Sequence, residues 1–286
     1  MNTADIRVSP AGRRTLPTAG AGILLLFVLT AVFAPRLVSH DPIRQDLAHT
    51  LLPPAWQHGG QADHLLGTDS LGRDVLSRLV YGSRVSLFVG LVSVLLGLLV
   101  GTAGGMLAGV VGGWIGTVVM RMADVQLAMP FLLMAIAIIG AFGPSTTNLT
   151  GVLVLSLWPG YARIVRGEVL SVKQNQFVEA AVAAGCGRWR LIVAHILPNV
   201  ANTIIVMATV NFGTMIVFEG GLSFLGVGVQ PPTPSWGGML ADGRAYLTVA
   251  WHLATFPGLA ILLIVLATNT CGDWLREVLD PRRRKA

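Results

Sequence analysis

The chain has 286 residues, of which 53% are hydrophobic and only 12% are charged, and its mean hydropathy is +0.68. Soluble domains normally carry about 25% charged residues, so this composition excludes an ordinary soluble globular protein. The formal net charge of +6 would suit a nucleic-acid-binding protein, but a membrane protein gains the same excess from Lys and Arg residues in its cytoplasmic segments.

Six apolar stretches, each close to the ~20 residues that a transmembrane helix needs, follow one another along the chain. They cover residues 17–36, 85–111, 118–142, 147–166, 199–221 and 250–271. We therefore predict an all-α membrane protein with six transmembrane helices, in which residues 85–271 form a five-helix domain. Pro130 is expected to kink the third stretch. The first stretch ends at Ala34-Pro35-Arg36 without a small-residue cleavage site, which favours an uncleaved span over a signal peptide.

The charges of the connecting segments predict an orientation. These segments are an N-terminal tail over 1–16, an external segment over 37–84, loops over 167–198 and 222–249, and a tail over 272–286. Six crossings put both termini on one side, and placing them inside puts 14 of the 20 Lys and Arg residues inside, as the positive-inside rule requires. We expect both termini and the loop 167–198 in the cytoplasm. The net positive charge is then explained by the cytoplasmic segments of a protein embedded in the lipid bilayer, and no nucleic-acid partner is expected.

Four of the six histidines, His40, His49, His58 and His64, fall in the external segment. Their spacings match no common metal-ligand pattern, so we predict ordinary loop histidines and no metal site; a metal-related role is the alternative. The two cysteines, Cys186 and Cys271, are far apart in the sequence and are expected to be free thiols.

The second stretch carries a glycine at every fourth position. These glycines are Gly97, Gly101, Gly105, Gly109 and Gly113. A spacing of four places them on one helix face, where the absence of side chains lets another membrane helix approach closely. We predict a packing seam. A smooth lining of a transport path is the alternative, and the two are compatible.

The chain lacks motifs that would power chemistry or transport. It has no phosphate-binding loop, no nucleophile elbow and no H-E-x-x-H zinc motif. The spans also lack the acid, base and His relays of proton-coupled transporters, since Glu219 and Asp124 stand near span ends. We expect a non-enzyme that depends on a partner for energy. The alternatives are a self-powered carrier or channel, which uptake by the isolated chain would favour, and a membrane-embedded hydrolase.

The loop 167–198 interrupts the apolar sequence with a helical hairpin. Ser171 and Gln174 form a weak capping box, which predicts a helix from there to Ala184, ended by Gly185 and Gly187. A second short helix is expected from Arg188, and Pro198 suits the first turn of the next span. Small alanines beside Glu179 give a smooth surface with one charge, which indicates docking of a partner; a solvent-facing hairpin is the alternative.

The same loop carries a family resemblance. Glu179-Ala180-Ala181-x3-Gly185-x11-Leu197-Pro198 resembles the EAA signature of ABC importer permeases, in which a coupling helix sits in a cleft of the ATP-binding subunit. His195 stands where the common form has Ile, a departure that resembles the dipeptide/oligopeptide/nickel branch. The segments 64–78 and 221–237 resemble the DppC/OppC-like permease subunits of that branch, as does Asp280-Pro281.

The resemblance implies a type I ABC importer permease fold in the bacterial inner membrane. It implies a permease subunit that forms half of the pathway for di- or oligopeptides and holds no cofactor of its own. The implied partners are a homologous second permease, two ABC ATPase subunits that bind ATP and Mg²⁺, and a periplasmic or lipid-anchored substrate-binding protein. The alternative cargoes are nickel chelates, glutathione and opine-like solutes.

The resemblance also assigns site residues. The residues expected to couple the chain to the ATPase are Glu179, Ala180, Ala181, Gly185, Leu197 and Pro198. The residues expected along the substrate pathway, from their outward position in the predicted orientation, are Glu219, Gln230 and Trp236.

Overall fold

A computed structural model describes residues 12–279 of the chain, with side chains from residue 18 onward. Apart from one isolated bridge between Thr68 and Asp74, the regular structure of these residues is entirely helical, which confirms the predicted class. The helices are α1 (Gly12–Leu37), α2 (Val75–Val110), α3 (Gly113–Leu127), α4 (Phe131–Phe142), α5 (Thr146–Lys173), α6 (Gln176–Ala183), α7 (Arg188–Arg190), α8 (Leu197–Phe224), α9 (Trp236–Arg244) and α10 (His252–Leu279). A 3₁₀ turn covers Leu47–His49, and a π-helical turn covers Leu191–Ile196.

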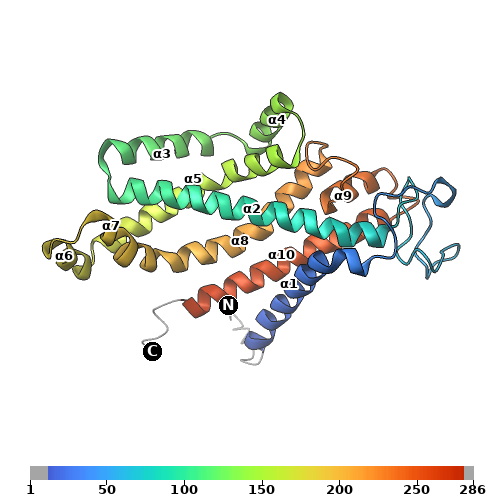
Figure 1. The fold of residues 1–286 in the computed structure, drawn as a ribbon, viewed down its shortest axis with the longest axis horizontal. Helices are drawn as coiled ribbons and strands as arrows, with labels where there is room; N and C mark the ends of the chain where they lie inside the picture. The colour runs from blue at the N-terminus through green and yellow to red at the C-terminus, as the bar shows by residue number, and fades with distance from the viewer. Residues whose placement is uncertain (1–11, 280–286) are drawn as a thin grey trace, which may run out of the picture.

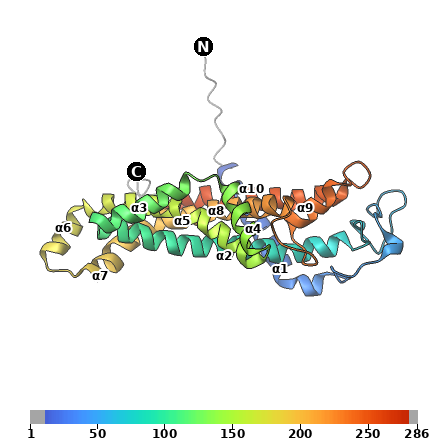
Figure 2. The same ribbon diagram turned by 90° about the horizontal axis from the view of Figure 1, so that it is seen from above.

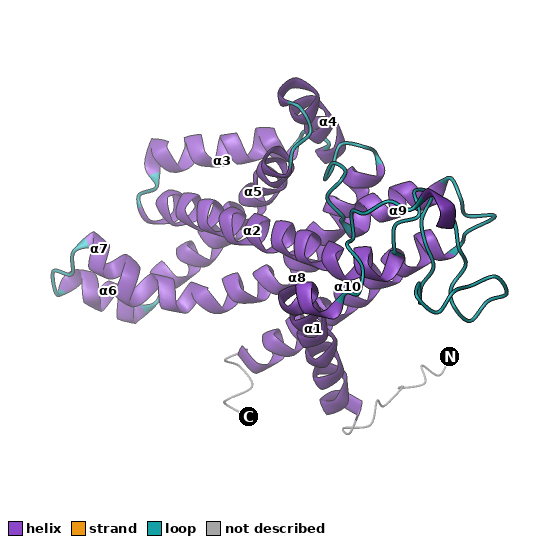
Figure 3. Cartoon of the chain, turned by 45° about the vertical axis from the view of Figure 1, so that its right-hand side comes forward, coloured by secondary structure: helices purple, strands orange, loops and turns teal. Residues whose placement is uncertain are grey.

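The long helices give the molecule two distinct ends (Figure 1). The hairpin of α6 and α7 projects at one end, which we call the hairpin end. The loops over 38–74 gather beside α9 at the other end, which we call the loop end, and Figures 2 and 3 show the same separation from other sides. The long helices α2, α5, α8 and α10 run lengthwise along the bundle, as expected of a multi-pass membrane protein.

Four of the described helical segments are long and apolar enough to cross a membrane: α1, α2, the run from α7 through α8, and α10. The predicted third span is broken at the expected place, where α3 and α4 are separate helices that meet at 91°. Pro130 is the last residue of the break, and a proline both lacks the N–H of the helix and disfavours helical geometry at the residue before it. If this bent pair counts as one span, the number rises to five.

Helix α5 covers the fourth predicted span, and at 28 residues it is about 42 Å long. It falls outside the apolar set because polar residues such as Asn148, Arg163 and Glu168 dilute its sequence. It packs along α2 and also contacts α3, α4 and α8. A helix that is surrounded by other helices meets less lipid than one at the edge, so it can carry more polar side chains.

The glycines of α2 form the predicted packing seam against α5. A Cβ atom added at Gly105 would lie 2.6 Å from the carbonyl oxygen of Ala162, and one added at Gly109 would lie 2.7 Å from Val169 Cγ1. Gly97 and Gly101 face α5 in the same way. The seam ends one step earlier than predicted, because α2 ends at Val110 and Gly113, with a φ of +55°, is the first residue of α3.

Several boundaries differ from the predicted ones. Helix α2 begins at Val75, ten residues earlier than expected, because the Asp74 side chain caps it by accepting a hydrogen bond from the Ser77 N–H at 2.8 Å. Helix α10 continues to Leu279 and takes in the start of the predicted C-terminal tail. Most of the predicted N-terminal tail, together with Asp280-Pro281, lies outside the described residues.

Candidate functional site

The hairpin at residues 174–196 is built differently from its predicted start. Helix α5 continues to Lys173, and the Gln174 N–H donates to the Ser171 carbonyl. Ser171 and Gln174 therefore end a helix rather than begin one, and the predicted capping box was wrong. Helix α6 begins after Asn175, whose side chain makes no capping bond. The local signal misled because Val169 and Val172 are buried in the core, which extends α5 beyond the apolar span.

The tip of the hairpin confirms the predicted helix end at Gly185. This residue has a φ of +81°, a left-handed conformation that glycine adopts without steric cost. Its N–H donates to the Val182 carbonyl at 3.0 Å, and the Cys186 N–H donates to the Ala181 carbonyl at 3.0 Å. These two bonds form a Schellman cap. Gly187 instead has extended backbone and precedes α7.

One face of the hairpin is anchored to the bundle. Val178 of α6 and Leu191 and Ile196 of the π-helical turn are 3%, 7% and 0% exposed. They pack in one apolar cluster with Val169 of α5 and Val200 of α8. The second arm of the hairpin, from Arg188 onward, continues without a break into α8. The hairpin is therefore attached rigidly to α5 through α6 and to α8 through the second arm.

The exposed part of the hairpin carries four large apolar side chains among its polar residues. Phe177, Val182, Trp189 and Val193 are 44%, 55%, 77% and 45% exposed. We call these four residues the hairpin surface. A hairpin that faces only solvent would bury its apolar side chains and expose polar ones. Exposed apolar side chains are instead typical of an interaction surface.

All six predicted coupling residues lie in the hairpin or in the first turn of α8. Glu179 and Ala180 are exposed, whereas Ala181 is half-buried against the anchoring cluster. The other three are exposed and are found at the tip and at the start of α8, namely Gly185, Leu197 and Pro198. The six residues are spread from α6 through the tip to the start of α8, and their role in coupling stays a prediction.

The predicted pathway residues lie in different surroundings. Glu219 and Trp236 are 0% exposed. The Glu219 carboxylate accepts hydrogen bonds from Ser86 Oγ at 3.0 Å and Ser223 Oγ at 2.9 Å, and the Trp236 indole donates to the Leu79 carbonyl at 2.9 Å. These bonds join α2, α8 and α9. In this conformation neither side chain reaches a surface.

Gln230, the third predicted pathway residue, is half-buried in the loop before α9, where its amide donates to the Gly228 carbonyl at 3.0 Å. Contact of Glu219, Trp236 or Gln230 with a substrate stays a prediction.

A cavity that sequence reasoning missed lies between α5, α8 and α10. Its volume is 520 Å³, and it is lined by the half of α5 that leads into the hairpin, the half of α8 that follows the hairpin, and the end of α10. Its polar lining consists of Glu168, Asn202, Thr203, Asn211 and Arg276. Thr203 Oγ1 lies 3.2 Å from Glu168 Oε1. Polar residues within otherwise apolar helices are the signal that could have found this cavity, since such residues mark transport pathways in membrane proteins.

The loop end has a buried ionic network. Asp69 accepts from the backbone N–H groups of Leu71 and Arg73 and pairs with Arg73 Nε at 2.7 Å and Arg78 Nε at 3.5 Å. Asp242 of α9 lies 3.4 Å from Arg73 and 3.6 Å from Arg78. This network explains the charged 64–78 motif as a clamp between the external loop, α2 and α9.

Comparison with known proteins agrees with this architecture. Residues 101–285 match the family described as the binding-protein-dependent transport system inner membrane component, and residues 13–54 match the N-terminal transmembrane domain of oligopeptide transport permease C. The chain is 45% identical over 267 residues to the di/tripeptide transport system permease protein DppC of Pseudomonas aeruginosa, which covers 93% of this chain and 88% of that protein. It is 39% identical to the glutathione transport system permease protein GsiD of Pectobacterium atrosepticum, over 94% of this chain and 88% of that protein.

The fold is similar to a solved structure of the inward-facing MetNI methionine ABC transporter. The TM-score is 0.60 with 18% sequence identity, over 71% of this chain and 96% of that chain. This likeness shows a shared helical fold. The chain belongs to the family of binding-protein-dependent transport system inner membrane components. It is a permease subunit of an ABC importer, and members of this family work with ATPase and substrate-binding partners.

Proposed function

We propose that this chain is one of two homologous permease subunits in an ATP-driven importer of di- and oligopeptides, and that the hairpin docks on an ATPase subunit. The exposed hairpin surface carries the docking proposal, because the described residues leave Trp189 77% and Val182 55% exposed. Two ATPase subunits would bind ATP and Mg²⁺ and hydrolyse the nucleotide. This chain would contribute the docking surface and half of the pathway, without a cofactor of its own.

The attachment of the hairpin supports a mechanism for coupling. Val178 ties α6 to α5, and the second arm leads directly into α8. A displacement of the hairpin by closing ATPase subunits would therefore move the adjoining ends of α5 and α8 together. Both helices line the 520 Å³ cavity. The motion of the ATPase subunits would in this way change the shape and access of the cavity without any chemistry in this chain.

The lining of the cavity suits a peptide. Glu168 and Arg276 place opposite charges in one cavity, and Asn202 and Asn211 add amide groups. A short peptide carries an ammonium group, a carboxylate and amide bonds, all of which such groups can bind. The DppC relative from Pseudomonas aeruginosa supports a di- or tripeptide substrate. Glutathione is the second candidate, supported by the GsiD relative; nickel chelates and opine-like solutes complete the alternatives.

The orientation is part of the proposal. The hairpin end and both termini would face the cytoplasm, where the ATPase subunits are found. The loop end would face outward and receive substrate from a periplasmic or lipid-anchored binding protein. The excess of Lys and Arg in the segments assigned to the cytoplasm supports this orientation.

Uptake in a strain that lacks only this chain tests the substrate. We expect the strain to lose uptake of a radiolabelled dipeptide and to regain it with the wild-type chain. Thr203→Val, which alters the cavity beside Glu168, should lower the uptake. Thr214→Val on the same helix is the matched control, because its exposed hydroxyl bonds only to the Val210 carbonyl and lies outside the cavity. Undiminished dipeptide uptake together with lost glutathione uptake would instead support the glutathione alternative.

A further inference from the structure

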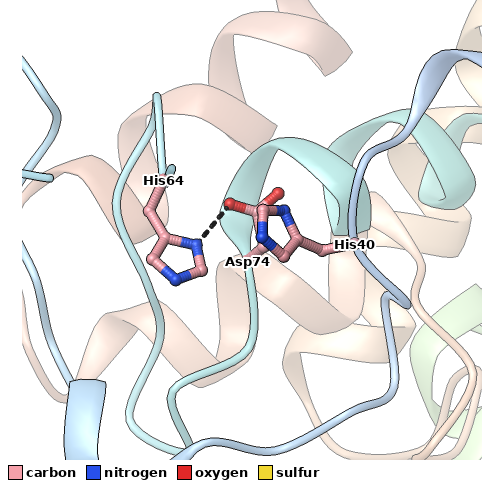
Figure 4. A group of neighbouring side chains, drawn as sticks. All are labelled: His40, His64 and Asp74. Atoms are coloured by element: carbon pink, nitrogen blue, oxygen red, sulfur yellow. Dashed lines mark hydrogen bonds and ion pairs between the residues drawn. The ribbon is translucent and has the colours of Figure 1, made fainter. Parts of the chain in front are cut away.

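Three potential metal ligands converge at the loop end. His40 follows α1, His64 lies in the external loop, and Asp74 precedes α2; Figure 4 shows the three side chains together. One ligand atom from each residue lies within 4.8 Å of the other two. His64 Nδ1 is 3.0 Å from Asp74 Oδ1, and the ring centroids of His40 and His64 are 4.8 Å apart.

Two of the three ligands are held in place by other contacts. The Asp74 side chain is 4% exposed, and its second oxygen, Oδ2, accepts the capping bond from the Ser77 N–H at 2.8 Å. This bond fixes the carboxylate and leaves Oδ1 directed at His64. The His64 side chain is 12% exposed, and the Thr68–Asp74 bridge holds its loop against the start of α2.

His40 has a different environment. Its side chain is half-buried, and within the described residues its ring makes no hydrogen bond, although it lies against the ring of His64. The pairing of His64 with Asp74 explains those two residues without a metal. It does not explain why a third ligand residue, 24 positions away from His64 in the sequence, lies over them with its ring nitrogens unused.

The donor set selects the class of ion. Two imidazole nitrogens and one carboxylate oxygen suit Zn²⁺, whereas Mg²⁺ and Ca²⁺ prefer oxygen ligands alone. Bonds of about 2.0–2.1 Å in a tetrahedral site put ligand atoms about 3.4 Å apart, so the widest separation of 4.8 Å would have to shorten by about 1.4 Å. Rotation of the His40 side chain, which no hydrogen bond restrains, could supply this movement.

We propose that His40, His64 and Asp74 form a site for one Zn²⁺ ion, with water in the fourth position. The ion would join the segment after α1 to the external loop and to the start of α2. Since these segments are distant in the sequence, the ion would stabilise the loop end by closing the chain between them. This inference concerns the folded loop end and is independent of the transported substrate.

Competition with a chromophoric zinc chelator tests the site. The full-length chain, with its co-purifying subunits, would be isolated through a histidine-free tag, stripped of metal and titrated with Zn²⁺ at neutral pH. We expect one high-affinity ion per chain. His40→Gln and Asp74→Asn should each weaken its binding by at least about 100-fold. Asn still caps a helix well, so Asp74→Asn keeps the start of α2 intact.

His58→Gln is the matched control, because His58 belongs to the same loop but is exposed and outside the cluster. The control should bind Zn²⁺ as the wild type does. Zinc should also raise the melting temperature of the wild type and of the control but not that of His40→Gln, and Mg²⁺ should not replace it. A wild-type chain without a high-affinity ion, or equal affinities in the wild type, His40→Gln and Asp74→Asn, would overturn the proposal.

Discussion

At the loop end, the charged side chains of Asp69, Arg73 and Arg78 are 6%, 5% and 4% exposed and are paired with one another. At the hairpin end, the apolar side chains of Val182 and Trp189 are 55% and 77% exposed. Each end thus reverses the usual arrangement of a soluble protein, in which charges are exposed and apolar groups are buried.

The difference separates residues that hold the chain together from residues that are available to a partner. The charges of the loop end satisfy one another inside the chain, so they need no second protein. The apolar groups of the hairpin surface are left uncovered although Val178 and Ile196 of the same hairpin are well buried. Substitutions at the loop end should therefore change stability, whereas those on the hairpin surface should change transport alone.

The largest expected effect on stability is at Asp69. Asp69→Ala leaves two buried guanidinium groups without their nearest carboxylate, and loss of one partner from a buried ion pair costs about 3–5 kcal/mol. Asp242→Ala removes a side chain that is 45% exposed and pairs at 3.4–3.6 Å, so it should cost about 1 kcal/mol or less. Thermal unfolding of the purified proteins in detergent measures both. Equal losses would show that the network is not the buried clamp described above.

The seam between α2 and α5 lies between the two ends. Substitutions in it should cause the next largest loss of stability. Gly105→Ala places a Cβ 2.6 Å from the Ala162 carbonyl oxygen, and overpacking of this kind costs about 1–3 kcal/mol. Gly104→Ala is the matched control, because its Cβ would lie 3.5 Å from Val119 Cγ1, an ordinary contact. The control should be neutral or stabilising by about 0.5–1 kcal/mol. The seam would be refuted if the two variants unfolded at the same temperature.

A smaller effect is expected at the hairpin tip. Gly185→Ala forces a side chain into the left-handed region at a cost of about 1–2 kcal/mol, while Gly185→Asn should cost less because Asn tolerates this conformation. The loss concerns the cap of α6, so protease sensitivity of the hairpin measures it better than global unfolding. We expect uptake to fall in the same order, with Gly185→Pro the most severe. Full uptake in Gly185→Pro would contradict coupling through the tip.

The smallest effect on stability, and the sharpest contrast, is expected at Trp189. Trp189→Ser changes an exposed side chain, so the free energy of unfolding should move by no more than about 0.5 kcal/mol, yet peptide uptake should be lost. Trp114→Ser is the control, since Trp114 is 76% exposed on α3 and outside the hairpin. Measuring the membrane abundance and the uptake of each variant together shows whether transport is lost while the folded protein remains. Normal uptake in Trp189→Ser would remove this residue from the docking surface.

Local sequence signals predicted the features that depend on interactions between residues close together in the sequence. The glycine spacing of α2 predicted the seam, and Gly185 predicted the end of α6, because a small residue and a left-handed cap act within one or two turns. Pro130 predicted a disturbance, but the size of the bend depends on how α3 and α4 pack and is not written in the local sequence.

Features that depend on distant contacts were not predictable. Glu219 stands near the end of an apolar stretch, so only the structure reveals that Ser86, 133 positions away, binds it. Helix α2 was expected to start at residue 85, where the apolar stretch begins, but it takes in the buried Arg78, which pairs with Asp69 within the fold. In the sequence, the spacing of His40 and Asp74 gave no sign of a metal site, because only tertiary packing brings these residues together.

Photo-crosslinking at the two ends tests the central claim most directly. A photoreactive amino acid would replace Val182 on the hairpin surface in one variant and Leu47 at the loop end, which is 71% exposed, in another. The adducts formed in intact cells would be identified by mass spectrometry. We predict an adduct from position 182 with an ATP-binding subunit, and none with that subunit from position 47. An adduct with that subunit from position 47, or none from position 182 while uptake remains normal, would contradict docking through the hairpin.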